Sequence, residues 1–296
     1  MKKLFVLVAT AAAAHSAFAA ETYNVEAGVQ YQTQSTDDKT DLTATAIAGT
    51  YYLKPITIDG TQPFMELDVL QRASGISVRY ANVSMETAAL SKTTLNPVEV
   101  SGNFFVDDFV LGFNNSTWDK NFNLKSSAAN YYGIKSTTTG FNVGYWVLPN
   151  TVVSFVNEKN EANYTRSSNS LSAIADVTNT TNGVLSHSVV SLGGAQSLVL
   201  DLGYKQVKRE QTTSKTNTEY AAKVRYYPEA KYFFEGGYSV NSGDYDYNKG
   251  KAFMVGAGYA FTPRFAVLLS TEKFNGDVAS EQSSGTSTTL TAGYRF

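Results

Sequence analysis

The sequence predicts an all-β domain, a transmembrane antiparallel up-and-down β-barrel. Three observations lead to this prediction. Apolar residues recur at every second position, short turns alternate with long polar segments, and aromatic residues gather near the ends of the predicted strands. A strand with one apolar and one polar face has this period of two, and no helical spacing is sustained after the N-terminal segment.

The first 19 residues are typical of a cleavable signal peptide. Lys2 and Lys3 precede an apolar run from Leu4 to Ala14, and Ala17, Phe18 and Ala19 form a small-residue cleavage site. The run is roughly half as long as the ~20 apolar residues that a transmembrane helix needs. We therefore expect residues 1–19 to be removed and residues 20–296 to form the barrel, exported to the outer membrane of a Gram-negative bacterium.

The composition excludes several classes of protein. Cysteine is absent, which removes disulfides, zinc-thiolate sites and cysteine nucleophiles. Without Lys2 and Lys3 the chain keeps 22 basic and 26 acidic side chains, a mildly acidic balance. Nucleic-acid binding needs clustered basic residues instead, so we expect no nucleic-acid partner.

The period of two is clearest at both ends of the predicted barrel. Tyr23, Val25, Ala27, Val29 and Tyr31 alternate with polar residues and glycine, and the pattern returns between Thr289 and Phe296. Counting such runs gives about 14 strands, with 12 or 16 left open. The predicted strands are 22–34, 42–53, 63–83, 98–106, 109–116, 138–148, 151–160, 184–193, 197–210, 218–227, 231–241, 251–261, 264–274 and 285–296.

Short turns and long polar segments separate these strands in strict alternation. Pro149, Pro228 and Pro263 mark three short turns, because proline suits a turn but not a hydrogen-bonded ladder. Asp107 with Asp108, Gly193 with Gly194, and residues 54–63 supply the others. The long segments are 35–41, 84–96, 116–138, 157–182, 211–217, 241–249 and 275–285. Outer-membrane barrels have this asymmetry, with short periplasmic turns and long external loops.

Aromatic residues at the strand ends favour a membrane barrel over a soluble β-sandwich. They are Phe104, Phe109, Tyr145, Tyr226, Tyr232, Phe261, Phe265 and Phe296. Amphipathic rings are enriched where a barrel meets the lipid headgroups. Because unpaired backbone groups are costly in hydrocarbon, the first and last strands are expected to pair and leave no open edge. Outer-membrane lipid is therefore an expected partner.

The opposite face of the strands predicts a polar lumen. The candidate pore-lining residues are Glu26, Glu66, Asp68, Arg72, Glu99, Asp201, Lys205, Lys223, Arg225, Glu235 and Arg295. Glycines on the same face, among them Gly112 and Gly258, are expected to leave room. One interpretation is that the charges pair within the wall, as Glu235 could with Lys223 or Arg225. The sharper hypothesis is that Lys223, Arg225 and Arg72 face Glu66 and Asp68 across a constriction.

A wet lumen of about 14 strands predicts a porin. Barrels of 16 or 18 strands leave an aqueous channel, whereas eight-stranded barrels are filled by side chains. We expect passive diffusion of small hydrophilic solutes and ions. Two alternatives stay open: a specific uptake channel for a small acid or sugar, and a non-conducting barrel that serves adhesion or structural anchoring through loops such as 157–182.

No motif predicts catalysis. After the predicted signal peptide the chain has one histidine, His187, which we interpret as a strand residue between Ser186 and Ser188. Nucleophilic catalysis would need an imidazole base placed beside a nucleophile, and no common catalytic or phosphate-binding motif is present. We expect no enzyme, no cofactor and no metal site.

The segment from Pro63 to Ser74, the repeated strand–turn–strand units and the terminal Tyr294, Arg295 and Phe296 invite a comparison. With them the chain resembles the putative general bacterial porin family over nearly its whole mature length. This resemblance implies a diffusion channel without catalytic residues. Tyr294 and Phe296 are similar to the signal that the barrel-assembly machinery recognises. The chain is shorter than the large trimeric porins and lacks their acidic tight-loop motif, so a monomer and a homotrimer both stay open.

Overall fold

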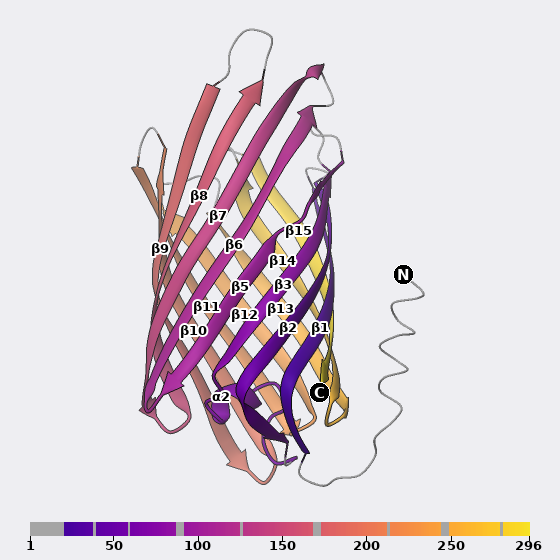
Figure 1. The fold of residues 1–296 in the computed structure, drawn as a ribbon, viewed down its shortest axis with the longest axis vertical. Helices are drawn as coiled ribbons and strands as arrows, with labels where there is room; N and C mark the ends of the chain where they lie inside the picture. Colours follow the sequence, from indigo (N-terminus) through magenta and orange to yellow (C-terminus); the bar gives the residue numbers. More distant parts are fainter. Residues whose placement is uncertain are drawn as a thin grey trace.

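The structure is a computed structural model that describes residues 21–296, apart from 38–39, 59, 87–91, 125–126, 168–172, 212–213, 244–248 and 279–280. The predicted signal peptide, residues 1–19, lies outside the described residues. Within the described part, fourteen antiparallel strands close into a barrel (Figure 1), and a short additional strand pairs with one of them. The same part contains no helix that is both long and apolar enough to cross a bilayer.

The strands follow one another around the barrel in sequence order. Their bounds are β1 (Glu21–Thr36), β2 (Asp41–Ile58), β3 (Gly75–Glu86), β4 (Thr93–Leu95), β5 (Val98–Val106), β6 (Phe109–Leu124), β7 (Ser127–Leu148), β8 (Thr151–Ser167), β9 (Ala173–Gly193), β10 (Gln196–Glu210), β11 (Ser214–Glu229), β12 (Tyr232–Gly243), β13 (Lys249–Thr262), β14 (Phe265–Val278) and β15 (Glu281–Arg295). One short helix, α2 (Leu67–Leu70), lies between β2 and β3.

The barrel closes as predicted. β1 pairs with β15 from Glu26 opposite Arg295 to Thr36 opposite Gly285. This pairing supplies hydrogen-bond partners to both edge strands, which a sheet in hydrocarbon requires. The end of the barrel that carries the short turns and α2 is called the turn end below, and the opposite end is called the loop end (Figure 1).

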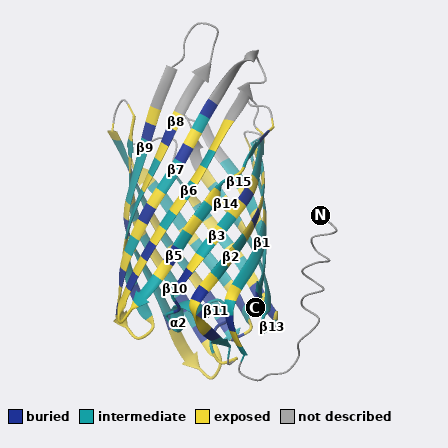
Figure 2. Ribbon diagram, in the orientation of Figure 1, coloured by how far each residue is buried: buried dark blue, intermediate teal, exposed yellow. Residues whose placement is uncertain are grey.

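The outer wall is apolar. Exposed and less exposed residues alternate along the strands (Figure 2), and the exposed positions include Leu202, Tyr220, Val224 and Phe234. Aromatic rings contact one another near the turn end, where Tyr259 lies 4.9 Å from Phe261 between ring centroids. Phe109 and Tyr145 form a similar pair on β6 and β7 at 5.2 Å. These contacts agree with the predicted aromatic girdle.

Several segments predicted as long loops are strands instead. β6 and β7 continue through most of 116–138, and β8 and β9 through most of 157–182. The β7–β8 ladder is continuous there, with Ser136 opposite Ala162. Because most of these residues are polar, the regular apolar alternation that marks a strand is lost while the backbone pairing continues.

The strand predicted over 63–83 was wrong in its first half. β3 begins at Gly75, and residues 60–74 fold into the turn end of the barrel with α2 at their centre. The apolar residues Phe64, Leu67 and Leu70 recur every third position, which is a helical and not a strand spacing. Residues 60–74 are called the inserted segment below.

Candidate functional site

The predicted pore-lining residues divide into two groups. Eight of them lie on wall strands, at positions that alternate with the exposed apolar residues: Glu26, Glu99, Asp201, Lys205, Lys223, Arg225, Glu235 and Arg295. The other three, Glu66, Asp68 and Arg72, lie on the inserted segment. The lumen is therefore bordered by the wall strands and also by this segment.

The inserted segment is anchored to three sides of the wall by apolar side chains. Phe64 belongs to a buried cluster with residues of β9 to β13, and Leu67 belongs to another with residues of β1 and β2. Val69 packs against a third cluster on β6, β7 and β8. The wall residues of the three clusters are Val189, Val199, Tyr227, Phe233 and Ala260; Tyr23, Tyr52 and Ile56; and Val110, Trp146 and Val152. The segment thus crosses the lumen at the turn end.

A buried ionic contact lies at the centre of this arrangement. Glu66 accepts a short hydrogen bond from the Arg225 guanidinium, and the Tyr227 hydroxyl lies 3.2 Å from the same carboxylate oxygen. His187 Nε2 lies 3.3 Å from the other Glu66 oxygen, and Arg225 Nε donates to Glu235 at 3.2 Å. The Glu66 side chain is only 4% exposed. Removing one partner of such a buried pair typically costs about 3–5 kcal/mol, because the remaining charge is left uncompensated.

Further polar contacts hold both ends of the inserted segment. Arg295 donates to the Phe64 carbonyl at 2.6 Å, next to its ion pair with Glu26. At the other end, Arg72 donates to the Asp107 carbonyl at 2.8 Å and to the Asp108 carboxylate at 2.9 Å. The hypothesis that Arg72 faces Glu66 across the lumen is therefore wrong: Arg72 binds the turn between β5 and β6. Arg225 contacts Glu66 directly, and Lys223 contacts Asp201.

Asp68 introduces a titratable carboxyl into the inserted segment. Burial, followed by the nearby carboxylates of Glu26 and Glu66, raises its pKa from 3.8 to about 6, against the opposing charge of Arg295. The side chain therefore changes its charge close to neutral pH. This places a proton-dependent group on the segment that crosses the lumen.

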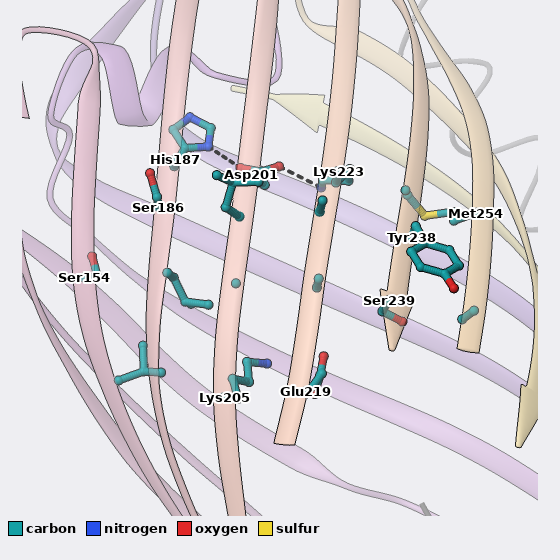
Figure 3. Close-up of a pocket in the computed structure, with 18 of the residues that line it drawn as sticks. Ser154, Ser186, His187, Asp201, Lys205, Glu219, Lys223, Tyr238, Ser239 and Met254 are labelled. Atoms are coloured by element: carbon teal, nitrogen blue, oxygen red, sulfur yellow. Dashed lines mark hydrogen bonds and ion pairs between the residues drawn. The ribbon is translucent and has the colours of Figure 1, made fainter. Parts of the chain in front are cut away.

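A cavity of about 660 Å³ lies on the loop side of the Glu66 contact. His187 joins the two sites: its Nδ1 lies 2.6 Å from Asp201, and Asp201 also pairs with Lys223 at 3.2 Å (Figure 3). The lining is mixed, with charged side chains beside Leu185, Gly203, Ala221 and Met254. The arrangement can hold a small solute but places no nucleophile beside the imidazole in the contacts of His187 described above.

Sequence reasoning missed three residues of this site. Glu219 and Glu272 line the cavity. Glu219 lies on the same alternating face of β11 as Lys223 and Arg225, so the strand pattern could have identified it. His187 was interpreted only as a strand residue. Its contact with Asp201 follows from the pairing of β9 with β10, whereas its contact with Glu66 depends on the inserted segment and has no local sequence signal.

The inward glycines leave less room than expected. A side chain at Gly258 would overlap the ring of Phe233, and one at Gly112 would overlap Asn142. Neighbouring side chains already occupy these spaces. Glycine therefore serves close packing at these positions instead of widening the lumen.

Comparisons with known proteins agree with this architecture. The family model described as "Putative general bacterial porin" matches residues 1–292. No curated protein sequence matches the chain. Among solved structures, the outer membrane protein Omp33 of Acinetobacter baumannii is similar, with 17% identity, a TM-score of 0.53, and coverage of 93% of this chain and 99% of that chain. The toluene transporter TbuX of Ralstonia pickettii has 12% identity, a TM-score of 0.55, and coverage of 93% and 90%.

At these identities the solved structures establish the fold alone. The family match covers nearly the whole chain and adds a transport role, and together they support a location in the bacterial outer membrane. A closed wall, an apolar outer surface and a polar lumen are what such a protein requires. The chain belongs to the putative general bacterial porin family.

Proposed function

We propose that the protein is a channel in the outer membrane of a Gram-negative bacterium, through which small hydrophilic solutes and ions diffuse passively. The observation that carries this proposal is the cavity of about 660 Å³ inside the closed wall, bordered by Asp201, Lys205, Glu219 and Lys223. Charges of both signs favour water and polar solutes in a lumen and screen them by size and polarity.

The inserted segment is proposed to act as the constriction of this channel. It contacts the wall on three sides, and Glu66 attaches it to β11 and β9. Passage of a solute then depends on the space beside the inserted segment and on how firmly this segment is held against the wall. The predicted constriction is retained in this proposal, but with a different set of charges from those that the sequence suggested.

The test is conductance of the purified, detergent-folded protein in planar bilayers, together with swelling of liposomes in small sugars. We expect stepwise ion conductance and swelling that slows as the sugar becomes larger. A Glu66→Ala variant, with a loosened segment, is measured beside the wild type. If both fold as barrels, shown by heat-modifiable migration, and neither conducts, the channel proposal fails and a structural or adhesive barrel replaces it.

A hydrocarbon channel is the competing transport function, because TbuX is a toluene transporter. The charged residues of the cavity favour hydrophilic solutes instead. Uptake of toluene and of arabinose into proteoliposomes separates the two functions. Faster entry of toluene with no effect on arabinose would overturn the proposed solute class.

A further inference from the structure

We infer that the lumen holds a binding site for a small zwitterionic solute of the amino-acid type, formed by β10 and β11 beside the inserted segment. This inference rests on the proposed channel function and names a solute class for it. It depends on three adjacent levels of the wall. Each level is a set of lumen-facing residues that the strand register places opposite one another on neighbouring strands.

The register places a small, largely apolar surface between two charged levels. At the level nearest the turn end, Asp201 lies opposite both Lys223 and His187. At the middle level, Gly203 lies opposite Ala221 and Leu185. At the level nearest the loop end, Lys205 lies opposite Glu219. All of these residues line the cavity, and Figure 3 shows most of them as sticks on β9, β10 and β11.

Gly203, Ala221 and Leu185 give the middle level a small, apolar surface. The nearest atoms to a side chain built on Gly203 would be Leu185 Cδ2 at 3.2 Å and Ala221 Cβ at 3.8 Å. Leu185 therefore lies close over Gly203, and the apolar part of a solute can pack against Leu185 and Ala221 between the charged levels. A cavity of about 660 Å³ is ample for a small molecule, since ligand pockets commonly measure about 300–1,000 Å³.

The two charged levels differ in how their charges are satisfied. Asp201 is paired with His187 at 2.6 Å and with Lys223 at 3.2 Å. Among the residues that the structure describes, by contrast, the side chains of Lys205 and Glu219 form neither an ion pair nor a hydrogen bond, although the two residues are opposite each other on β10 and β11. An ammonium and a carboxylate thus lie side by side in a partly enclosed cavity, without side-chain partners in the part of the chain that the structure describes.

A zwitterion satisfies both groups at once. Its carboxylate accepts hydrogen bonds from Lys205, its ammonium donates to Glu219, and a short side chain lies over Gly203, Ala221 and Leu185. A simple acid or a simple amine would satisfy one group and leave the other exposed to a like charge. Each of these hydrogen bonds involves charged groups and is therefore expected to contribute at least tenfold in affinity.

The test compares three solutes of similar size: alanine, propionate and ethylamine. Saturation-transfer NMR on the detergent-folded barrel measures binding without requiring conduction. We expect a saturable signal for alanine and at least tenfold weaker signals for propionate and ethylamine. Lys205→Gln and Glu219→Gln should each weaken alanine binding about tenfold.

Two further variants separate a binding role from a structural one. Lys159→Gln is the matched control, because Lys159 pairs with Glu161 at 2.6 Å on an exposed part of β8 and should leave binding unchanged. The exchange of charges in Lys205→Glu with Glu219→Lys should restore alanine binding relative to either single exchange. Barrel folding of every variant is checked by heat-modifiable migration.

The outcomes distinguish this inference from the channel proposal. If the wild type conducts ions but alanine gives no saturable signal, or if propionate binds as well as alanine, the binding site is refuted and the channel stands. If alanine binds and no folded variant conducts, the site stands and the channel proposal fails. Unchanged alanine binding in Lys205→Gln would also overturn the inference.

Discussion

The turn end of the lumen and the cavity beside it use the same residue types in opposite ways. At the turn end, the charge of Glu66 is enclosed by Arg225, Tyr227 and His187, and the aromatic rings around it are buried. In the cavity, Lys205 and Glu219 have no protein partner among the described residues. The comparison teaches that satisfied charges fix a segment in place, whereas unsatisfied charges are available to solutes.

Glu66→Ala should produce the largest change at the turn end. It leaves Arg225 with Glu235 alone and removes a buried pair, at a cost of about 3–5 kcal/mol in docking free energy. We expect higher single-channel conductance and faster amide hydrogen exchange in residues 60–74. Glu161→Ala, at an exposed ion pair, is the control that should change neither quantity. Equal conductance of the wild type and Glu66→Ala would show that Glu66 does not anchor the inserted segment.

Phe64→Ala tests the apolar part of the same anchor. Phe64 is 5% exposed and lies 5.8 Å from the Phe233 ring and 6.1 Å from the Tyr227 ring. Loss of a buried phenylalanine costs about 3–5 kcal/mol, less where the surroundings collapse into the space. We expect conductance to rise as in Glu66→Ala, by a smaller amount because the ionic contact remains. Conductance at or below the wild-type value would show that the ring does not hold the segment.

Gly258→Ala tests how tightly the wall packs around this anchor. The added methyl group would overlap the ring of Phe233, whereas at Gly28 it would meet only the Ala292 carbonyl, at 3.4 Å. Overpacking typically costs about 1–3 kcal/mol. The midpoint of thermal unfolding in detergent should therefore fall for Gly258→Ala and stay near the wild-type value for Gly28→Ala. Equal midpoints for the two variants would mean that the ring moves away at no cost.

The pH dependence should be the smallest effect. In the docked segment the pKa of Asp68 is raised to about 6, so protonation favours docking. Docking is then strongest below about pH 4, near the ordinary pKa of aspartate, and weakens as the pH rises through 6. We expect lower conductance at pH 5 than at pH 7.5 in the wild type.

The Asp68→Asn variant separates the pH effect of Asp68 from that of the charged groups near it, which are Glu26, Glu66 and Arg295. The variant should keep the low conductance at both pH values. A conductance that rises on acidification, or a pH dependence that survives in Asp68→Asn, would assign the effect to another group.

Much of the wall could be predicted from the sequence, whereas the site could be predicted only in part. The face assignment of Lys223 and Arg225 follows from their alternation with Ala222 and Val224, because each strand has one side in lipid. The predicted contact of Glu235 with Arg225 is confirmed, since the two residues are opposite each other on neighbouring strands. The mostly polar extensions of β6 to β9 are not predicted, because they lack the regular apolar alternation of the membrane-facing part.

The sequence by itself determined the barrel, its approximate strand number and which side chains face lipid. These properties depend on a residue and its immediate neighbours, because the bilayer selects apolar side chains one strand at a time and forbids an unpaired edge. Only the tertiary structure decided that residues 60–74 enter the lumen and that Glu66 binds Arg225, 159 positions away in the chain. Such contacts exist only after closure brings distant strands around a common interior, so no local periodicity encodes them.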